Sequence, residues 1–398
     1  MSDLQSWLRS ALAEVAAADQ YRHRRVVTVV DPASPVYVQV DGQACLNFCS
    51  NDYLGLSTHP QVRRAMSAAA ERYGVGSGAA HLVTGHSPEH HALEAELAAF
   101  VGRERALLFS TGYMANLAVA AALLQRGDAV FEDRLNHASL LDGGLLSGAR
   151  FARYAHGDMA ALRSKLSASS APHKLVLSDA VFSMDGDLAP LTELAQTCAA
   201  QQAWLMIDDA HGFGVLGEQG QGSVQAAGLT QTEVPIYMAT LGKAVGVAGA
   251  FIAGSHELIE WLIQAARTYI YTTAQPPAIA AATRAALQLV AQESWRRDKL
   301  QALIQRFRIG VTQLGLSLLP SNTAIQPIVL GSAAAAVQAS EWLRARGLVV
   351  SAIRPPTVPL HTARLRITLS AAHSEADVDQ LLTALQQLPK SLPSAESR

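Results

Sequence analysis

Short apolar runs alternate with amphipathic stretches through the middle of the chain. Between residues 106 and 254, these runs are separated by segments whose apolar positions recur every three or four residues, as in helices. The runs that we predict as strands are 106–110, 129–133, 150–154, 175–179, 203–208, 234–239 and 248–254. Such alternation predicts an α/β domain with a mostly parallel, seven-stranded sheet that is flanked by helices.

The two ends of the chain have different patterns. Residues 2–21 place apolar side chains at helical spacing, and residues 36–48 read as a hairpin around Asp41-Gly42. After a long helix at 295–314, the pattern gives strand, helix, strand, strand and helix. We therefore expect an N-terminal helix and hairpin (1–48), a large cofactor-binding α/β domain (49–290) and a small α+β domain (291–398).

Composition narrows the function classes. The 398 residues are 49% hydrophobic and 16% charged with a net charge of −2, which indicates a globular protein without a basic field for nucleic acid. The three cysteines form no CxxC pair, so we expect core residues in a reducing compartment and no metal site. The start of the sequence lacks a signal-peptide pattern, and no run approaches the ~18 apolar residues of a membrane span. A cytoplasmic enzyme is the default expectation.

Two of the predicted strands end in reactive side chains. The first is followed by Asp208, Asp209 and His211, and the second by Thr240 and Lys243. Neighbouring strands would deliver a carboxylate, an imidazole and an amine to one edge of the sheet. This combination suits pyridoxal 5'-phosphate, whose ring nitrogen needs an anion and whose aldehyde needs an amine. Alternatively, the Asp208 carboxylate only caps the turn that follows its strand.

Lysine is scarce in this chain, and one lysine stands apart. Four of the five lie in polar, helical or tail contexts, whereas Lys243 is surrounded by apolar residues and glycines (241–250). Burial lowers the pKa of a lysine and so favours Schiff-base chemistry. The alternative is a lysine that is ion-paired with a buried acid.

A glycine pattern beside His211 invites a different interpretation. Residues 212–217 match GxGxxG after a strand, which is the pattern of a dinucleotide-binding loop. That loop requires a helix to begin at the glycines, but residues 218–223 read as a further loop. We therefore expect no nucleotide there, although a nucleotide-dependent oxidoreductase stays an alternative.

Several other residues could complete a site. Residues 110–114 open a helix after a strand, where free backbone N–H groups can hold a phosphate, as they can in any capped helix. His137 follows a strand and could stack on a ring or cap a helix, and Ser183 could donate a hydrogen bond. Arg354, before two prolines, could bind a carboxylate or lie at the surface.

The motifs at 208–214, 240–243, 51–56 and 182–187 together resemble those of the α-oxoamine synthases. The resemblance spans nearly the whole chain. Members of this family are pyridoxal-phosphate enzymes of fold type I, the aspartate-aminotransferase fold, and they condense an amino acid with an acyl-CoA and release carbon dioxide. The resemblance implies the same fold, cofactor and type of reaction for this chain.

Within this family, residues 76–86, 352–359 and 362–373 are similar to the 8-amino-7-oxononanoate synthase branch. Relatives that use glycine or serine usually carry an arginine near position 81, where this chain has Ala80 and His81. The resemblance thus implies L-alanine and a pimeloyl thioester, on CoA or on acyl carrier protein, in biotin biosynthesis. A 2-amino-3-ketobutyrate CoA ligase, acting on glycine and acetyl-CoA, is the alternative within the family. A cofactor-binding protein without catalysis is the alternative outside it.

The resemblance also implies roles for individual residues. The catalytic set comprises Lys243, which forms the Schiff base and moves the α-proton, His137 and Asp208. The expected cofactor contacts are Gly112, Tyr113, Ser183, Asp208, His211, Thr240 and Lys243, together with Thr272 and Thr273 from the partner subunit of a homodimer. The expected substrate contacts are Arg22, Asn51, His137, Arg354 and Thr357.

Overall fold

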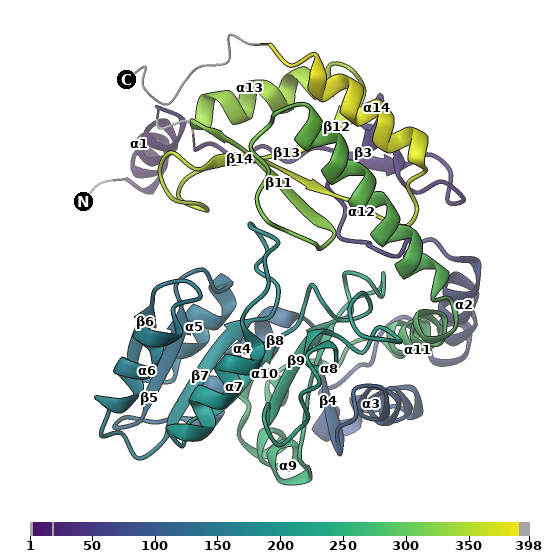
Figure 1. Ribbon diagram of the computed structural model, residues 1–398. Helices are drawn as coiled ribbons and strands as arrows, with labels where there is room; N and C mark the ends of the chain where they lie inside the picture. Colours follow the sequence, from purple (N-terminus) through teal and green to yellow (C-terminus); the bar gives the residue numbers. More distant parts are fainter. Residues whose placement is uncertain (1–2, 18–19, 390–398) are drawn as a thin grey trace. The chain divides into compact units, whose positions relative to one another are not determined.

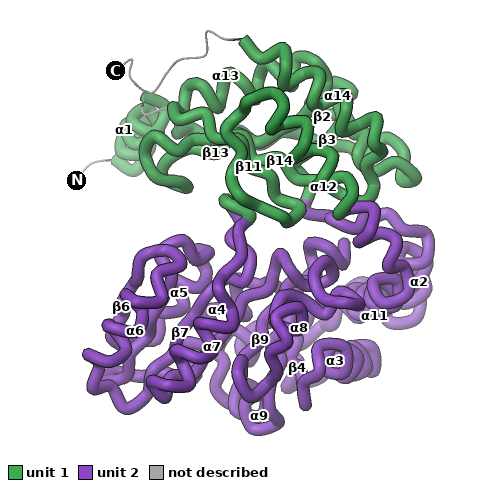
Figure 2. The backbone as a smooth tube through the Cα atoms, in the orientation of Figure 1, with its two compact units in different colours: residues 1–50, 184–186, 301–398 green, residues 51–183, 187–300 purple. Residues whose placement is uncertain are grey.

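The computed structural model describes residues 3–17 and 20–389. The chain forms two compact units (Figure 2): unit 1 comprises residues 1–50, 184–186 and 301–398, and unit 2 comprises residues 51–183 and 187–300. The chain therefore leaves unit 2 at Met184 and returns at Asp187. The finer division into three parts stays a prediction.

Unit 2 is built on a sheet of seven strands (Figure 1). Its order is β4-β10-β9-β8-β7-β5-β6; β10 runs antiparallel to both of its neighbours, β4 and β9, whereas the other adjacent pairs are parallel. The bounds are β4 (Arg105–Phe109), β5 (Ala129–Asp133), β6 (Arg150–Tyr154), β7 (Lys174–Asp179), β8 (Trp204–Asp208), β9 (Ile236–Thr240) and β10 (Ala250–Gly254). The predicted mostly parallel sheet is confirmed, with each strand close to its predicted place.

Both faces of this sheet are buried. Leu175 and Leu177 belong to a core cluster that includes residues of α4 (Gly112–Leu123), α5 (Ala138–Leu146), α9 (His256–Ala265) and α10 (Arg267–Ile270). Val176, which lies between them in β7, points to the opposite face and is also fully buried. Burial on both sides explains why the strands read as continuous apolar runs rather than as alternating ones.

The remaining helices of unit 2 include three that the sequence did not predict, at 60–73, 81–85 and 223–226. A single π-helical turn, η1 (His81–Gly85), lies where we expected a glycine-rich loop. The other helices are α2 (Pro60–Tyr73), α3 (Pro88–Phe100), α6 (Met159–Ser167), α7 (Leu191–Ala200), α8 (Ser223–Ala226) and α11 (Pro277–Gln292). Helix α12 (Trp295–Gln313) begins in unit 2 and continues in unit 1.

Unit 1 contains two small sheets. The first has the order β1-β2-β3-β12, with β1 (Val27–Val29), β2 (Tyr37–Val40), β3 (Gln43–Asn47) and β12 (Leu348–Val349). The second has the order β11-β14-β13, with β11 (Ile325–Gly331), β13 (Ser351–Ile353) and β14 (Ala363–Thr368). The helices are α1 (Leu4–Ala17), α13 (Ala333–Arg344) and α14 (Glu375–Gln386).

Two predictions for unit 1 can be compared with its strands. The hairpin around Asp41-Gly42 is confirmed, and both turn residues have positive φ (52° and 85°), as a type I′ turn requires. The single strand predicted at 348–353 is wrong, because β12 pairs with β3 whereas β13 pairs with β14. Within the described residues, no helix is both long and apolar enough to cross a membrane.

Candidate active site

Residues from several strand ends surround a cavity of about 190 Å³ in unit 2. The carboxyl ends of parallel strands lie at one edge of a sheet, so residues that follow β5, β7, β8 and β9 meet there. Of the residues predicted for the site, the cavity is lined by Gly112, Tyr113, His137, Ser183, Asp208, His211, Thr240 and Lys243. Distant parts of the sequence thus converge as the strand pattern requires.

Three adjacent strands of the sheet each end in an aspartate. Asp133 ends β5, Asp179 ends β7 and Asp208 ends β8, and Asp179 lies directly beside Asp208 in the parallel register. Like charges this close cannot both be ionised cheaply. The pKa of Asp179 is raised well above its usual range, first by complete burial and then by the charge of Asp208. Sequence reasoning missed Asp179, although its place at a strand end matches that of Asp208.

Asp208 is held by hydrogen-bond donors. Its Oδ2 accepts a hydrogen bond from Asn116 Nδ2 (2.7 Å), and its Oδ1 accepts one from the Ala210 backbone N–H (2.9 Å). Asn116 lies in α4 and also donates to Ser139 Oγ (2.8 Å). These donors fix the orientation of the Asp208 carboxyl group.

The same chain of hydrogen bonds reaches His137. The Ser139 hydroxyl, which accepts from Asn116, lies 2.7 Å from His137 Nδ1, so it can donate its own hydrogen there. The Ser139 N–H also donates to His137 Nδ1 (3.3 Å). Burial lowers the pKa of His137, and this effect is the largest one on the ring. Because the Ser139 N–H donates to Nδ1, that nitrogen carries no hydrogen, and the neutral imidazole has its hydrogen on Nε2.

Lys243 lies beside His211. Its Nζ is 2.8 Å from His211 Nε2, and His211 Nδ1 is 2.6 Å from the Tyr53 hydroxyl. Tyr53 also donates to Asn51 Oδ1 (3.2 Å). One consistent arrangement has each group donating to the next, from Lys243 through His211 and Tyr53 to Asn51. Tyr53 is fully buried and is a further residue that sequence reasoning did not single out.

The turn that presents Lys243 requires glycine. The Gly246 N–H donates to the Lys243 carbonyl (2.8 Å), and Gly246 has a φ of 73°. A Cβ at this position would lie 2.5 Å from the Ser57 backbone nitrogen. The glycine spacing after Lys243 is therefore a packing requirement of the site loop.

The amino end of α4 faces the same cavity. Thr111 caps the helix by accepting a hydrogen bond from Met114 N (3.2 Å), and Gly112 and Tyr113 line the cavity. The first N–H groups of a helix carry partial positive charge and suit a phosphate. Thr240 Oγ1 donates to the Gly249 carbonyl (3.0 Å), which fixes that hydroxyl at the cavity wall.

The glycine-rich stretch after His211 forms a loop, as predicted, because no helix begins before Ser223. Asp209 holds this loop, since its carboxyl accepts hydrogen bonds from Ser223 N (2.6 Å), Ser223 Oγ (2.5 Å) and Tyr237 Oη (2.9 Å). Burial raises the pKa of Asp209 to about 7. A Cβ on Gly212 would lie 2.1 Å from Asp209 Oδ1. The first glycine thus serves packing and not nucleotide binding.

Three histidines, His81, His86 and His90, lie close together at η1 and α3. His90 Nε2 donates to the Gln275 carbonyl (2.8 Å), and His90 Nδ1 accepts from Ser87 N (3.0 Å). His90 therefore has no nitrogen lone pair to offer a metal without losing its helix cap. Burial, with the two neighbouring rings, lowers the pKa of His81 to about 3.

Other predicted site residues lie elsewhere in the chain. Arg22, Arg354 and Thr357 belong to unit 1, where Arg354 Nη2 donates to the Tyr21 carbonyl (2.9 Å). Thr272 and Thr273 lie in unit 2 between α10 and α11, outside the lining of the cavity. The roles of these five residues stay predictions.

Comparison with known proteins gives a consistent picture. The family model of class I and II aminotransferases matches residues 43–385. The chain is 60% identical over 390 residues to an 8-amino-7-oxononanoate synthase of Cellvibrio japonicus, covering 98% of this chain and 97% of that protein. It is 59% identical over 388 residues to the enzyme of the same name from Pseudomonas aeruginosa, covering 98% and 96%. The chain belongs to the 8-amino-7-oxononanoate synthase family.

Solved structures agree with this membership. A serine palmitoyltransferase of S. paucimobilis, with a bound PLP–myriocin aldimine, matches with a TM-score of 0.91 at 28% identity, covering 97% of this chain and 98% of that chain. An 8-amino-7-oxononanoate synthase of Francisella tularensis matches with a TM-score of 0.76 at 32% identity, covering 86% and 97%. The predicted fold type I and the predicted class of enzyme, a PLP-dependent acyltransferase, are both confirmed.

Proposed function

We propose that this chain condenses L-alanine with a pimeloyl thioester to give 8-amino-7-oxononanoate, carbon dioxide and the free thiol of the carrier. The observation that carries the proposal is the convergence of Lys243, Asp208, His137 and the amino end of α4 on one cavity. The identity of 60% to 8-amino-7-oxononanoate synthases along nearly the whole chain supports this choice of reaction. We further propose that the reaction belongs to biotin biosynthesis and takes place in the cytoplasm.

The cavity fits pyridoxal 5'-phosphate by the chemistry of its donors. Asp208 offers a carboxylate to a protonated ring nitrogen, the amino end of α4 offers N–H groups to a phosphate, and Lys243 offers an amine. At Gly112 a Cβ would lie 2.9 Å from Met238 Cε, the end of a flexible side chain, so the wall is close to the backbone there. Asn116 Oδ1 is buried and has no hydrogen-bond partner among the described residues, so a further donor can be accommodated there.

Bound pyridoxal 5'-phosphate supplies an electron sink for the carbanion at the amino-acid α-carbon. The protein residues provide the proton transfers and the orientation. Lys243 Nζ takes the α-proton and later returns a proton, and His211, 2.8 Å away, holds that amine in place. Asp208, fixed by Asn116 and Ala210, supplies the negative charge opposite the ring nitrogen. Neutral His137 can lie flat against a ring without adding a second positive charge.

Asp179 lies beside Asp208 at the carboxyl edge of the sheet and limits the negative charge there. Its Oδ2 accepts the backbone N–H of His137 (2.8 Å), and burial together with the charge of Asp208 raises its pKa, which favours the neutral form. Two carboxylates at adjacent strand ends thereby take different roles because of their environments.

The proposal extends to substrate binding and assembly. The guanidinium group of Arg354 suits the carboxylate of the amino acid, and that of Arg22 suits the carboxylate of the acyl chain. Asn51 and Thr357 add polar contacts to the substrates. Thr272 and Thr273 reach the phosphate from the partner subunit of a homodimer. The acyl carrier is CoA or acyl carrier protein.

A substrate panel tests the proposed reaction. The purified enzyme with pyridoxal 5'-phosphate is incubated with alanine or glycine and with pimeloyl-CoA, pimeloyl-acyl carrier protein or acetyl-CoA, and the released thiol and carbon dioxide are measured. We expect the fastest turnover with alanine and a pimeloyl thioester. Faster turnover with glycine and acetyl-CoA would instead support a 2-amino-3-ketobutyrate ligase. If no substrate pair released carbon dioxide, both functions would be contradicted.

A further inference from the structure

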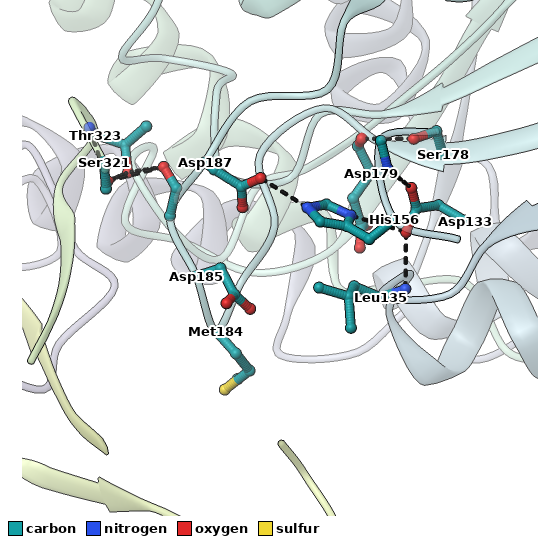
Figure 3. A network of polar contacts seen from close by, with 12 residues as sticks. Asp133, Leu135, His156, Ser178, Asp179, Met184, Asp185, Asp187, Ser321 and Thr323 are labelled. Atoms are coloured by element: carbon teal, nitrogen blue, oxygen red, sulfur yellow. Dashed lines mark hydrogen bonds and ion pairs between the residues drawn. The ribbon is translucent and has the colours of Figure 1, made fainter. Parts of the chain in front are cut away.

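His156 bridges two carboxylates outside the lining of the cavity (Figure 3). Its Nδ1 lies 3.0 Å from Asp133 Oδ1, and its Nε2 lies 2.8 Å from Asp187 Oδ2. Carboxylates only accept hydrogen bonds, so each ring nitrogen must carry a hydrogen. The contacts themselves therefore make His156 an imidazolium cation.

The electrostatics of this bridge agree with its geometry. The hydrogen bond to Asp133, followed by the one to Asp187, raises the pKa of His156 to about 10, and burial opposes the shift only in part. The titratable groups that face the ring are Asp133 from β5 and Asp187 from the loop after β7. The cation persists at neutral pH.

One side of the bridge supports the turn that presents His137. Asp133 Oδ1 accepts the Leu135 N–H (2.8 Å), Asp133 Oδ2 accepts the Gly157 N–H (2.9 Å), and the Asp133 carbonyl accepts the Asn136 N–H (3.2 Å). His137 follows this turn directly. The position of its ring thus depends on where Asp133 is held.

The other side supports the loop that presents Ser183. The Phe182 N–H donates to the Asp187 carbonyl (3.0 Å), and the Phe182 ring packs edge-on against His156 with centroids 4.4 Å apart. Ser183 follows Phe182 and lines the cavity. Residues 184–186 group with unit 1, so Asp187 is the point at which the chain returns to unit 2.

We propose that His156 is a positioning residue that ties the loop bearing Ser183 to the turn bearing His137, and so fixes how these two side chains meet the cofactor. The link to the cofactor rests on the proposed function. The tie between the two segments does not, because it follows from the contacts of His156 alone.

The chain offers a matched control for this proposal. His173 Nδ1 also lies 3.0 Å from an aspartate, Asp128 Oδ1, and Asp128 directly precedes the other end of β5. His173 also stacks on Trp204, and neither Asp128 nor Trp204 belongs to the turn of His137 or the loop of Ser183. Replacing His173 removes a similar histidine–aspartate contact at a distance from the cavity.

Hydrogen exchange followed by mass spectrometry tests the tie without requiring the cofactor. We expect His156→Leu to speed amide exchange about tenfold in both 133–139 and 181–188, with or without pyridoxal 5'-phosphate, and His173→Asn to change neither segment. Unchanged exchange in either segment of His156→Leu would overturn the proposal. Should that variant fail to fold, Asp187→Asn keeps the ring and removes one of its two carboxylates, and faster exchange in 181–188 is expected there.

Cofactor binding tests the second half of the proposal. We expect His156→Leu to raise the Kd of pyridoxal 5'-phosphate about tenfold and to weaken the circular dichroism of its visible band, while His173→Asn stays within twofold of the wild type. In Asp187→Asn the pKa of His156 falls, so its cofactor affinity should decline as the pH rises from 7 to 9, where wild-type affinity is steadier. Equal effects of the histidine variants would overturn a positioning role. A wild-type protein that binds no cofactor would refute the proposed function and leave the exchange result standing.

Discussion

The two ends of strand β5 carry the same pair of residue types at the same separation. Asp128, just before the strand, contacts His173, and Asp133, its last residue, contacts His156, with 3.0 Å between nitrogen and oxygen in each pair. At the first end the aspartate also closes a turn by accepting the Gln125 N–H (2.9 Å). At the second end, the histidine reaches a further carboxylate, and the turn leads into the candidate site.

The comparison of the two ends shows that the role of a histidine–aspartate contact depends on the segments that the contact connects. The amino end of β5 adjoins α4 through the turn at residues 124–128, and the contact there stabilises a connection. At the carboxyl end, Asp133, Asp179 and Asp208 end three adjacent strands, so carboxyl groups are concentrated at one edge of the sheet. Substitutions at the two ends should therefore separate effects on activity from effects on stability.

The largest effect is expected from Lys243→Ala at the carboxyl edge. Losing the amine removes both the cofactor attachment and the group that moves the α-proton, so we expect kcat to fall about 10⁴-fold or more. The visible absorption band of the bound cofactor should disappear, while the midpoint of urea unfolding stays close to that of the wild type. Activity that survives this substitution would contradict the assignment of Lys243.

A smaller loss is expected from Asp208→Asn. The amide can keep one hydrogen bond but not the negative charge, so we expect kcat/KM to fall about 10²- to 10³-fold. Asp128→Asn at the opposite edge provides the contrast. It should leave kcat/KM within twofold and lower the free energy of unfolding by about 1–2 kcal/mol. Similar values of kcat/KM for both variants would contradict a catalytic role for Asp208.

The sequence predicted the sheet and its reactive edge because apolar runs and their polar ends are local signals. Lys243 stood out for the same reason, as a charge in an apolar stretch. His156 gave no such signal, since its partners lie 23 and 31 residues away. Periodicity likewise could not show that residues 348–353 divide between two sheets, because an apolar run does not specify which strand it will pair with.

The pH dependence of the unfolding free energy tests how much the contacts of His156 with Asp133 and Asp187 stabilise the fold. The pKa of His156 is raised to about 10 in the folded protein, against about 6.5 when unfolded. Its contribution is therefore complete below pH 6.5 and is lost as the pH rises through 10. We expect His156→Leu to lower the unfolding free energy by about 2 kcal/mol at pH 6, and by much less at pH 10. Urea unfolding at both pH values measures this difference.

The control for this experiment is the pair at the other end of the strand. His173 lacks a second carboxylate, and its side chain is 49% exposed, so solvent screens its contact with Asp128. We expect His173→Asn to lower the unfolding free energy by less than about 1 kcal/mol at pH 6. A loss as large as that of His156→Leu would mean that the second carboxylate adds nothing.

Among the substitutions at the carboxyl edge, the smallest effect on kcat/KM is expected from Asp179→Asn, although Asp179 lies in the cavity beside Asp208. Burial and the charge of Asp208 raise the folded pKa of Asp179, which favours its neutral form, and an amide reproduces the charge and most of the shape of that form. The amide oxygen can still accept the backbone N–H of His137, so we expect kcat/KM within about fivefold of wild type. Because the unfolded acid ionises more readily than the folded one, the wild type loses stability as the pH rises above about 4, and Asp179→Asn should lose less. Urea midpoints at pH 4.5 and 7.5 test this sign. A variant that is relatively less stable at pH 7.5 would mean that Asp179 is ionised in the folded protein, and that the division of roles between the two strand-end carboxyls is wrong.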